Sequence, residues 1–176
     1  LTLSSHLSLT VTIHLLYRSS SKLQKSLPEL NSYMYQYKAT IIKVIDGDTV
    51  DVDIDLGFEV WLKNQRIRLY GIDTPESRTS DKVEKVFGNL AKSKVLEFCP
   101  VGSDIILQTK TDDSRGKYGR ILGELITKDG VNVNEYFIEN NYAVAYFGKS
   151  KDDIAQEQLA NREILIERGE VTLDVD

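Results

Sequence analysis

The stretch KATIIKVIDGDTVDVDIDL, residues 38–56, decides the fold. Its two halves, residues 38–45 and 49–56, are rich in β-branched side chains, and Asp46–Gly47 between them is typical of a hairpin turn. The second half alternates strictly, with apolar side chains on one face and aspartates on the other. We therefore predict two antiparallel strands joined by a tight turn, with the apolar face in the core.

Three aspartates, Asp51, Asp53 and Asp55, make up the polar face of the second strand. Acids at every second residue also occur in calcium-binding loops, which need a glycine at the sixth position and a glutamate at the twelfth. Leu56 and Leu62 stand at those positions here. We therefore reject a calcium loop and expect the aspartate row to be a solvated strand face.

Farther along the chain, the periodicity predicts one more strand beside the hairpin, then a helix, two strands and terminal helices. The expected elements are strands at residues 60–70, 104–110 and 118–126 and helices at residues 81–99, 132–140 and 152–167. This order fits a mainly β fold with helices (β/α+β), namely a five-stranded OB-fold barrel with about three helices. A small α+β sandwich fits the same order, so the pattern alone leaves both folds open.

Residues 1–33 differ in composition from the rest of the chain. They hold both histidines, three basic residues and one acid, and they are rich in serine and leucine. Such a segment is typical of a targeting peptide, although polar residues interrupt its apolar run at residues 9–17. The single methionine, Met34, directly precedes the first predicted strand. We expect a non-structural leader at residues 1–33, either an upstream or a targeting segment, and one folded domain at residues 34–176.

Charge and composition exclude several classes of function. The chain has 22 Lys+Arg and 27 Asp+Glu, and residues 34–176 keep 19 basic and 26 acidic residues, a net charge of −7, with no histidine. This domain therefore has no general basic surface for nucleic acid and no histidine for a nucleophile pair or a metal site. Cys99, the one cysteine, forms no internal disulfide, and no apolar run is long enough to span a membrane.

Two segments bring acids close to strand ends. In IDGDTV, Asp48 follows the turn, where its carboxylate can face inward from the mouth of the sheet. In RIRLYGIDTPES, Asp73, Thr74 and Glu76 lie on a bend that the proline stiffens, and Arg68 precedes them on the strand. Carboxylates on neighbouring strands can share a hard cation such as calcium. The alternative is that DTPE simply starts a helix.

Two further segments carry candidate substrate contacts. RGKYGR has two glycines for a tight turn, so Lys117 and Arg120 can project toward one anion, and a solvated basic hairpin is the alternative. YAVAYF offers Tyr142 and Tyr146 for stacking on a base. An aromatic strand packed on a barrel is the alternative for that segment.

Four motifs occur in order along the chain: DGDTV at residues 46–50, RLYGIDTPE at 68–76, KYGR at 117–120 and VNE at 133–135. Together they resemble the staphylococcal nuclease family, over about residues 37–168. The resemblance implies an OB-fold barrel with helices. It also implies a calcium-dependent endonuclease that hydrolyses phosphodiester bonds of DNA and RNA with little sequence specificity and leaves 3′-phosphate ends.

The resemblance further implies which residues hold the metal and activate water. Asp48 and Asp73 would ligate Ca²⁺ through their carboxylates, and Thr74 through its backbone carbonyl. Glu76 would orient or deprotonate the attacking water. Because cations lie near Glu76 in this arrangement, we expect the pKa of Glu76 to be lowered, which would make it a poor base.

Substrate contacts follow from the same resemblance. Arg68 and Arg120 would clamp the scissile phosphate, Lys117 and Tyr118 would lie near the terminal phosphate of the nucleotide, and Tyr146 would contact the substrate. The residue types suit the chemistry, because hydrolysis adds negative charge at phosphorus and preorganised positive charge lowers the barrier. Guanidinium groups match phosphate oxygens in shape and stay charged, so no histidine is required.

The chain also departs from the family. DIDLGFEVWLKNQ lengthens the hairpin between Asp48 and Arg68, and we expect it to change substrate access beside the site. The family's Tyr-x-Tyr pair is half present, because Gly148 follows Tyr146 at the second position. None of these changes removes a residue with an implied catalytic role.

A second function class stays open from the sequence: a noncatalytic OB-fold module that binds nucleic acid or protein. Such a module would not need the acids and arginines that this chain retains. We expect a monomer without membrane association. With no evident signal peptide we favour an intracellular or virus-encoded protein and leave secretion open.

Overall fold

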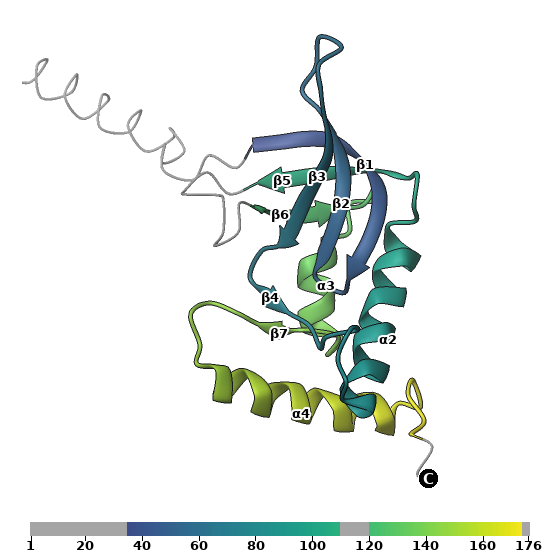
Figure 1. Ribbon diagram of the computed structural model, residues 1–176, viewed down its shortest axis with the longest axis vertical. Helices are drawn as coiled ribbons and strands as arrows, with labels where there is room; N and C mark the ends of the chain where they lie inside the picture. The colour runs from purple at the N-terminus through teal and green to yellow at the C-terminus, as the bar shows by residue number, and fades with distance from the viewer. Residues whose placement is uncertain (1–34, 110–119, 174–176) are drawn as a thin grey trace, which may run out of the picture. The chain divides into compact units, whose positions relative to one another are not determined.

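The computed structural model describes residues 35–109 and 120–173, and a closed five-stranded barrel forms its centre (Figure 1). The barrel strands are β1 (Tyr35–Asp46), β2 (Thr49–Asp55), β3 (Trp61–Leu69), β5 (Asp104–Thr109) and β6 (Ile121–Ile126). Around the barrel they follow the order β1-β2-β3-β6-β5, with β3 and β6 parallel and the other neighbouring strands antiparallel. This topology confirms the OB-fold barrel and excludes the α+β sandwich. The expected leader at residues 1–33 lies outside the described residues.

Helices and a small sheet surround one end of the barrel in the described part of the chain. They are α2 (Lys82–Phe98), α3 (Val133–Glu139), α4 (Lys151–Glu167), β4 (Ile72–Asp73) and β7 (Val144–Ala145). In Figure 1, α3 lies below the barrel, β4 and β7 pair beneath it, and α4 crosses the bottom. The helices match the predicted ranges closely. The β4–β7 sheet was not predicted, because two-residue strands have no periodicity to read.

The described helices begin at polar caps. Asp81, Asn132 and Ser150 accept hydrogen bonds from backbone N–H groups in the first turns of α2, α3 and α4. Because α2 begins at Lys82 behind its own cap, the segment DTPE does not start a helix. It is a separate bend that leads from β4 to α2. None of the helices in residues 35–109 and 120–173 is both long and apolar enough to cross a membrane.

The predicted apolar face of β2 does line the core. Val50 and Val52 are fully buried, and so is Ile67 on the neighbouring strand β3. Phe87 and Val95 of α2 are buried in the same cluster. The barrel interior is therefore a packed apolar core, and the polar side chains of β2 and β3 must lie on its outer surface.

The aspartate row is not a solvated face. Asp51 is only 6% exposed and accepts two hydrogen bonds from Arg66, at 2.8 Å from Nε and 3.0 Å from Nη2. Asp53 accepts from Lys63 Nζ and from the backbone N–H of Asn64, both at 2.8 Å. The reason is strand register: β3 pairs with β2 so that Arg66 lies directly opposite Asp51. Cross-strand ion pairs, which the sequence of β2 alone does not show, shield these acids.

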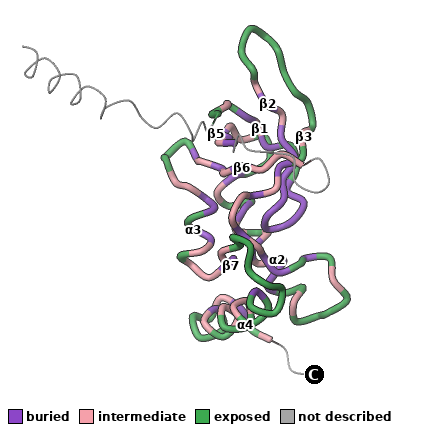
Figure 2. Tube along the Cα trace, turned by 90° about the vertical axis from the view of Figure 1, so that its left-hand side faces the viewer, coloured by how far each residue is buried: buried purple, intermediate pink, exposed green. Residues whose placement is uncertain are grey.

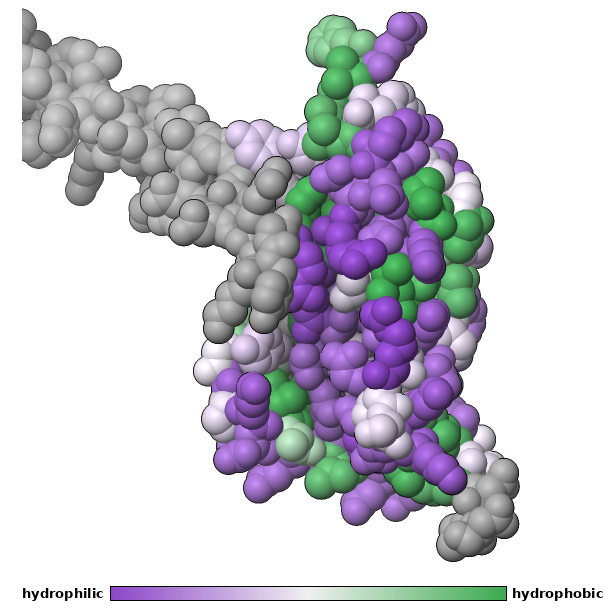
Figure 3. Space-filling view, viewed as in Figure 1, coloured by the Kyte–Doolittle hydropathy of each residue, from purple (hydrophilic) through white to green (hydrophobic). Residues whose placement is uncertain are grey.

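The long β2–β3 hairpin projects away from the rest of the barrel (Figures 1 and 2). Its tip at residues 56–60 is exposed, with Phe58 fully accessible and hydrophobic residues visible at the top of the space-filling view (Figure 3). Asp48 precedes β2 and Arg68 lies near the end of β3, so the seven-residue strand β2, about 20 Å long, separates the tip from both. The hairpin tip is therefore about one strand length away from Asp48 and Arg68, and its effect on substrate access stays a prediction.

Helix α2 packs directly on the bend that carries Glu76. A Cβ added to Gly88 would come within 2.5 Å of the carbonyl carbon of Glu76 and of the amide nitrogen of Ser77. Both atoms belong to the backbone, so they cannot rotate away. The close approach of α2 at Gly88 therefore sets the position of the bend.

We predict that Gly88→Ala destabilises the protein by about 1–3 kcal/mol, because the methyl group overpacks against the backbone of Glu76 and Ser77. Helix propensity alone favours alanine over glycine by about 1 kcal/mol. Without the clash, the substitution would therefore be expected to stabilise the protein. Urea unfolding measures the change. Asn89→Ala, at the next and exposed position of α2, is the matched control and should change stability by less than about 0.5 kcal/mol. A Gly88→Ala variant as stable as the parent would contradict the packing.

Candidate active site

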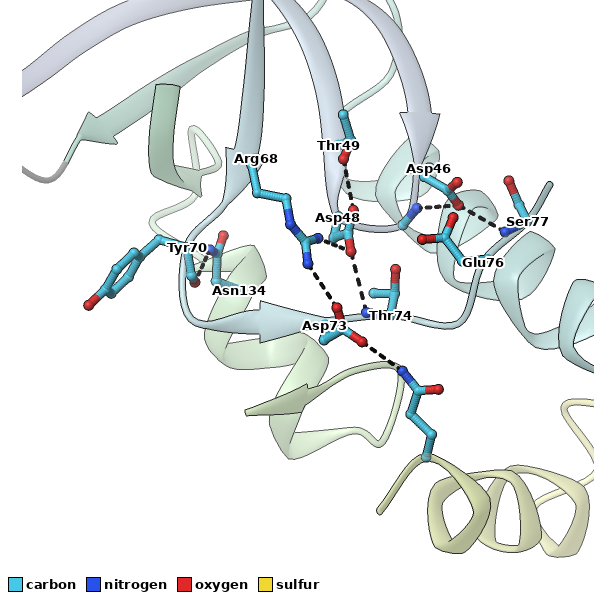
Figure 4. A network of polar contacts seen from close by, with 12 residues as sticks. Asp46, Asp48, Thr49, Arg68, Tyr70, Asp73, Thr74, Glu76, Ser77 and Asn134 are labelled. Carbon is cyan, nitrogen blue, oxygen red and sulfur yellow. Dashed lines mark hydrogen bonds and ion pairs between the residues drawn. The ribbon is translucent and has the colours of Figure 1, made fainter. Parts of the chain in front are cut away.

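Three chain segments meet at one end of the barrel and bring their polar side chains together (Figure 4). Asp48 lies in the turn between β1 and β2, Arg68 near the end of β3, and Asp73 at the end of β4. The register of β2 and β3 places Thr49 opposite Arg68, and the Leu69 amide donates to the carbonyl of Asp48 at 2.8 Å. Backbone pairing thus brings an arginine beside a carboxylate that precedes it by 20 positions in the sequence.

Arg68 bridges the two carboxylates. Its Nη1 forms an ion pair with Asp48 Oδ2, and its Nη2 donates a hydrogen bond to Asp73 Oδ1 at 2.9 Å. The guanidinium is well shielded, with 16% of the side chain exposed. Burial lowers the pKa of Arg68, the charge of Asp73 raises it, and the positive charge of nearby Arg120 lowers it again. Two acids and one cation therefore form a single interlocked group.

Other donors complete the environment of these carboxylates. Thr49 Oγ1 donates to Asp48 Oδ1 at 2.8 Å, and the Thr74 amide reaches Asp48 Oδ2 at 3.4 Å. Gln158 Nε2, from α4, donates to Asp73 Oδ2 at 2.9 Å. Sequence reasoning missed Gln158, and no local signal could have found it, because it is 85 residues from Asp73.

Asp46 holds the bend against the β1–β2 turn. It is 5% exposed, and its Oδ1 accepts hydrogen bonds from the amides of Gly47 at 3.2 Å and Ser77 at 3.1 Å. The sequence assigned Asp46 only to the turn. Its second bond, to Ser77, ties the turn to the segment that carries Glu76.

The pKa of Glu76 is raised, contrary to the expectation from nearby cations. Burial is the largest cause, followed by the negative charge of Asp46 and a hydrogen bond with it, and then by the charge of Asp73. Arg68 opposes this shift with a smaller effect. The expectation counted the cations around Glu76 but not the buried carboxylate of Asp46, which the fold places beside it; in the metal-free protein, partial desolvation and Asp46 outweigh Arg68.

Two clefts open from this group, and Arg68 and Arg120 line both. The first, which we call the arginine cleft, has a volume of about 380 Å³. It is lined by Ile45, Asp46, Asp48, Thr49, Arg66, Arg68, Glu76, Arg78 and Arg120. The second, the aromatic cleft, has a volume of about 700 Å³. It is lined by Arg68, Leu69, Tyr70, Gly71, Ile72, Asp73, Arg120, Leu122, Tyr146, Phe147 and Gly148.

The aromatic cleft contains one of the two tyrosines singled out in YAVAYF. Tyr146 is half exposed there, whereas Tyr142 is buried and its hydroxyl hydrogen bonds with Glu170. Phe147, which sequence reasoning missed, is 66% exposed and lies against Gly71, where an added Cβ would come within 2.7 Å of its ring. Gly71 also has a positive φ of 74°, which suits glycine. Most of YAVAYF is therefore not an aromatic strand on the barrel, because β7 comprises only two residues.

Asn134 supports the site from α3. It is 3% exposed, and its Nδ2 donates to the carbonyls of Tyr70 at 2.9 Å and Gly123 at 3.3 Å, while its Oδ1 accepts from Leu125 at 3.2 Å. One side chain therefore joins the segment between β3 and β4 to β6 (Figure 4). The VNE motif in the sequence marks this position.

The residues predicted to bind a metal fit a hard cation in their chemistry. Asp48 and Asp73 already converge on one cation, the guanidinium of Arg68, and all their ligand atoms are oxygens, as calcium prefers. Within the described ranges, no three Asp, Glu, His or Cys side chains form a metal-binding group. The candidate set is therefore two carboxylates and the carbonyl of Thr74, and Arg68 must release at least one carboxylate for a metal to share it.

The structure thus brings together most of the residues singled out in the sequence. The six residues predicted for metal binding and catalysis all lie in the group at the barrel end or line its clefts, namely Asp48, Arg68, Asp73, Thr74, Glu76 and Arg120. Tyr146 lies in the aromatic cleft. Lys117 and Tyr118 lie outside the described residues.

Fold and site together define an OB-fold protein with an acid and arginine centre at the end of its barrel. The family model described as "Staphylococcal nuclease homologue" matches residues 66–166, which is more than half of the 176-residue chain. The chain therefore belongs to the staphylococcal nuclease family, as its motifs predicted.

Relatives with printed names agree with this assignment. "Endonuclease YhcR" of Bacillus subtilis (strain 168) is 30% identical over 143 residues, which cover 77% of this chain and 11% of that protein. An "Uncharacterized endonuclease" of Escherichia coli is 31% identical over 114 residues, covering 65% of this chain and 64% of that protein. The chain thus spans a small part of the first relative and slightly less than two thirds of the second.

We predict that Asn134→Ala destabilises the protein by about 3 kcal/mol. The substitution leaves the buried amide of Leu125 without its hydrogen-bond acceptor and removes the hydrogen bonds to the carbonyls of Tyr70 and Gly123. Thermal or urea unfolding measures the loss. Glu135→Ala, at the exposed neighbouring position of α3, should have a much smaller effect. Equal stability of the two variants would show that Asn134 does not hold these segments together.

Proposed function

We propose that this chain is a calcium-dependent endonuclease that hydrolyses phosphodiester bonds of DNA and RNA with little sequence specificity and leaves 3′-phosphate ends. The observation that carries the proposal is the interlocked group of Asp48, Arg68 and Asp73, with Glu76 and Arg120 beside it on the same clefts. A binding module would not need two carboxylates held toward one cation. We also propose that the enzyme acts as a monomer, since the described site residues need no second chain to come together.

The metal would be held by the carboxylates of Asp48 and Asp73 and the carbonyl of Thr74. When bound, calcium supplies positive charge next to the phosphoryl oxygens and a place for the attacking water. Thr49 and Gln158 hold the two carboxylates through their other oxygens. Such outer contacts keep metal ligands oriented.

The two arginines bind the phosphate. A metal that shared the carboxylates would leave the guanidinium of Arg68 available to a phosphate oxygen, and Arg120 lines the same clefts. Negative charge increases on the phosphoryl oxygens as water attacks, so fixed guanidinium charges stabilise the transition state more than the bound substrate. The P–O5′ bond then breaks, the 5′ oxygen leaves and takes up a proton from solvent water to become a hydroxyl, and the phosphate stays on the 3′ oxygen.

Glu76 orients the water and accepts its proton. In the metal-free protein, partial desolvation and the neighbouring Asp46 raise the pKa of Glu76, which supports a role in accepting the proton of the water. Because Asp46 also binds the Ser77 amide, the same residue both tunes and positions Glu76. The aromatic cleft is suited to binding a nucleobase of a single-stranded substrate, because Tyr146 and Phe147 are exposed along it and can stack on the base.

We predict that cleavage of single-stranded and duplex DNA and of RNA requires calcium and stops in excess chelator. Gel analysis with and without added calcium measures the extent of cleavage, and end-labelling of the products identifies the 3′-phosphate. Asp73→Asn should raise the calcium concentration for half-maximal activity at least tenfold, because it removes a charged ligand. Asp53→Asn, an acid on β2 that pairs with Lys63 outside the site, is the control. Cleavage that persists in chelator would refute the mechanism, and binding without any cleavage would favour the noncatalytic module.

We also predict that Arg120→Lys lowers kcat by about 10²–10³, because a lysine cannot reproduce two-point contact with the developing charge. The effect on KM should be smaller, since the contact strengthens in the transition state. Steady-state kinetics on a labelled oligonucleotide separate the two constants. Lys128→Ala removes a positive charge that lines neither cleft and should leave both constants unchanged. An Arg120→Lys variant with full kcat would refute the role.

A further inference from the structure

The arginine cleft contains two arginines that the proposed chemistry does not use. Arg66 lies on β3 two residues before Arg68, and Arg78 follows the bend that carries Glu76. Both line the same cleft as Arg68 and Arg120. They therefore border the position proposed for the scissile phosphate.

This cleft is a local exception to the charge of the domain. Residues 34–176 carry a net charge of −7. The cleft, in contrast, is lined by four arginines and three carboxylates. If a metal neutralises part of the carboxylate charge, the surplus of positive charge increases further. A polyanion would thus be attracted to this cleft while the rest of the domain repels it.

Arg66 is held in place with part of its guanidinium unused. Its Nε and Nη2 donate to the buried carboxylate of Asp51 at 2.8 and 3.0 Å, while 52% of its side chain stays exposed. No described residue accepts a hydrogen bond from its Nη1. Such a bidentate pair fixes the direction of the guanidinium and leaves one edge for another acceptor. The hydrogen bond with Asp51, followed by the charge of Asp51, also raises the pKa of Arg66, so the group stays protonated.

Arg78 faces the cleft from the opposite chain segment. Its side chain is 69% exposed, and its Nε lies 3.9 Å from Asp46 Oδ2, a distance too long for a hydrogen bond. An exposed pair at this distance contributes little to stability. Arg78 can therefore turn toward an incoming anion at little cost in folding energy.

The spacing on β3 suits a nucleic-acid strand. Ile67 points into the core, so Arg66 and Arg68 lie on the same outer face of β3, about 6–7 Å apart. Neighbouring phosphates of an extended single strand have a comparable separation. If Arg68 contacts the scissile phosphate, Arg66 is in position for the next one.

We propose that Arg66 and Arg78 form a second phosphate subsite, which binds the backbone phosphate next to the scissile one. The inference rests on the proposed nuclease function and deepens it. It makes the preferred substrate a strand with several phosphates and not a dinucleotide. It also explains how an acidic domain without a general basic surface holds a polyanion: the contacts are concentrated in one cleft.

The test compares two substrates, a dinucleoside monophosphate with one phosphodiester and a single-stranded DNA of about 12 nucleotides. Arg78→Gln is the first variant. The second is Arg66→Gln combined with Asp51→Asn, so that no buried charge is left unpaired. Each should lower kcat/KM on the longer DNA by about tenfold and lower it much less on the dinucleotide. Lys128→Gln is the control, and Asp51→Asn alone shows how much of the loss in the double variant comes from removing the carboxylate that orients Arg66.

Salt dependence provides a second readout that a purely structural role would not change. For the longer DNA, the slope of log affinity against log salt should fall by about 0.7 for each arginine removed. Fluorescence anisotropy measures this slope without any cleavage, so the subsite is tested even if the parent proves inactive as a nuclease. Equal losses on both substrates, or an unchanged salt slope, would overturn the subsite.

Discussion

The rest of this site depends on the two ion pairs that the guanidinium of Arg68 forms with Asp48 and Asp73. Two shielded carboxylates so close together would repel each other strongly, and the arginine compensates both. Because the three residues come from the β1–β2 turn, β3 and β4, the same contact joins three segments of the chain. The structure and the proposed chemistry therefore involve the same charged groups, because a metal held by Asp48 and Asp73 would take over part of the charge compensation that Arg68 provides.

Three helices stabilise this arrangement from different sides. Gly88 of α2 lets the helix approach the backbone behind Glu76, Asn134 of α3 joins three backbone segments, and Gln158 of α4 holds Asp73. The barrel supplies the rigid frame, and the helices determine where the bend after β4 can lie. The helices are needed to hold the candidate site of this protein, since the bend itself has no strand partner after Asp73.

Sequence reasoning failed where a property depended on a second segment. The sequence of β2 alone predicted a solvated Asp51, but strand pairing places Arg66 of β3 opposite it. The motifs predicted that cations around Glu76 would lower its pKa, but in the metal-free protein desolvation and Asp46 raise it. The hairpin extension lies between Asp48 and Arg68 in the sequence, which suggests that it is near the site. It is, however, attached to the ends of β2 and β3 that lie away from these two residues. In each case the missing information was which residues lie side by side across strands or turns.

The amino-acid sequence by itself determined the five barrel strands, the described helices, the family and most residues of the candidate site. Periodicity and turn residues are local signals, and the motifs contain the acids and arginines directly. Only the tertiary structure decided that Arg68 bridges the carboxylates, that Gln158 and Asn134 support them, and that Arg66 and Arg78 share the cleft. These facts depend on strand register and helix packing, which are set by contacts between residues far apart in the chain.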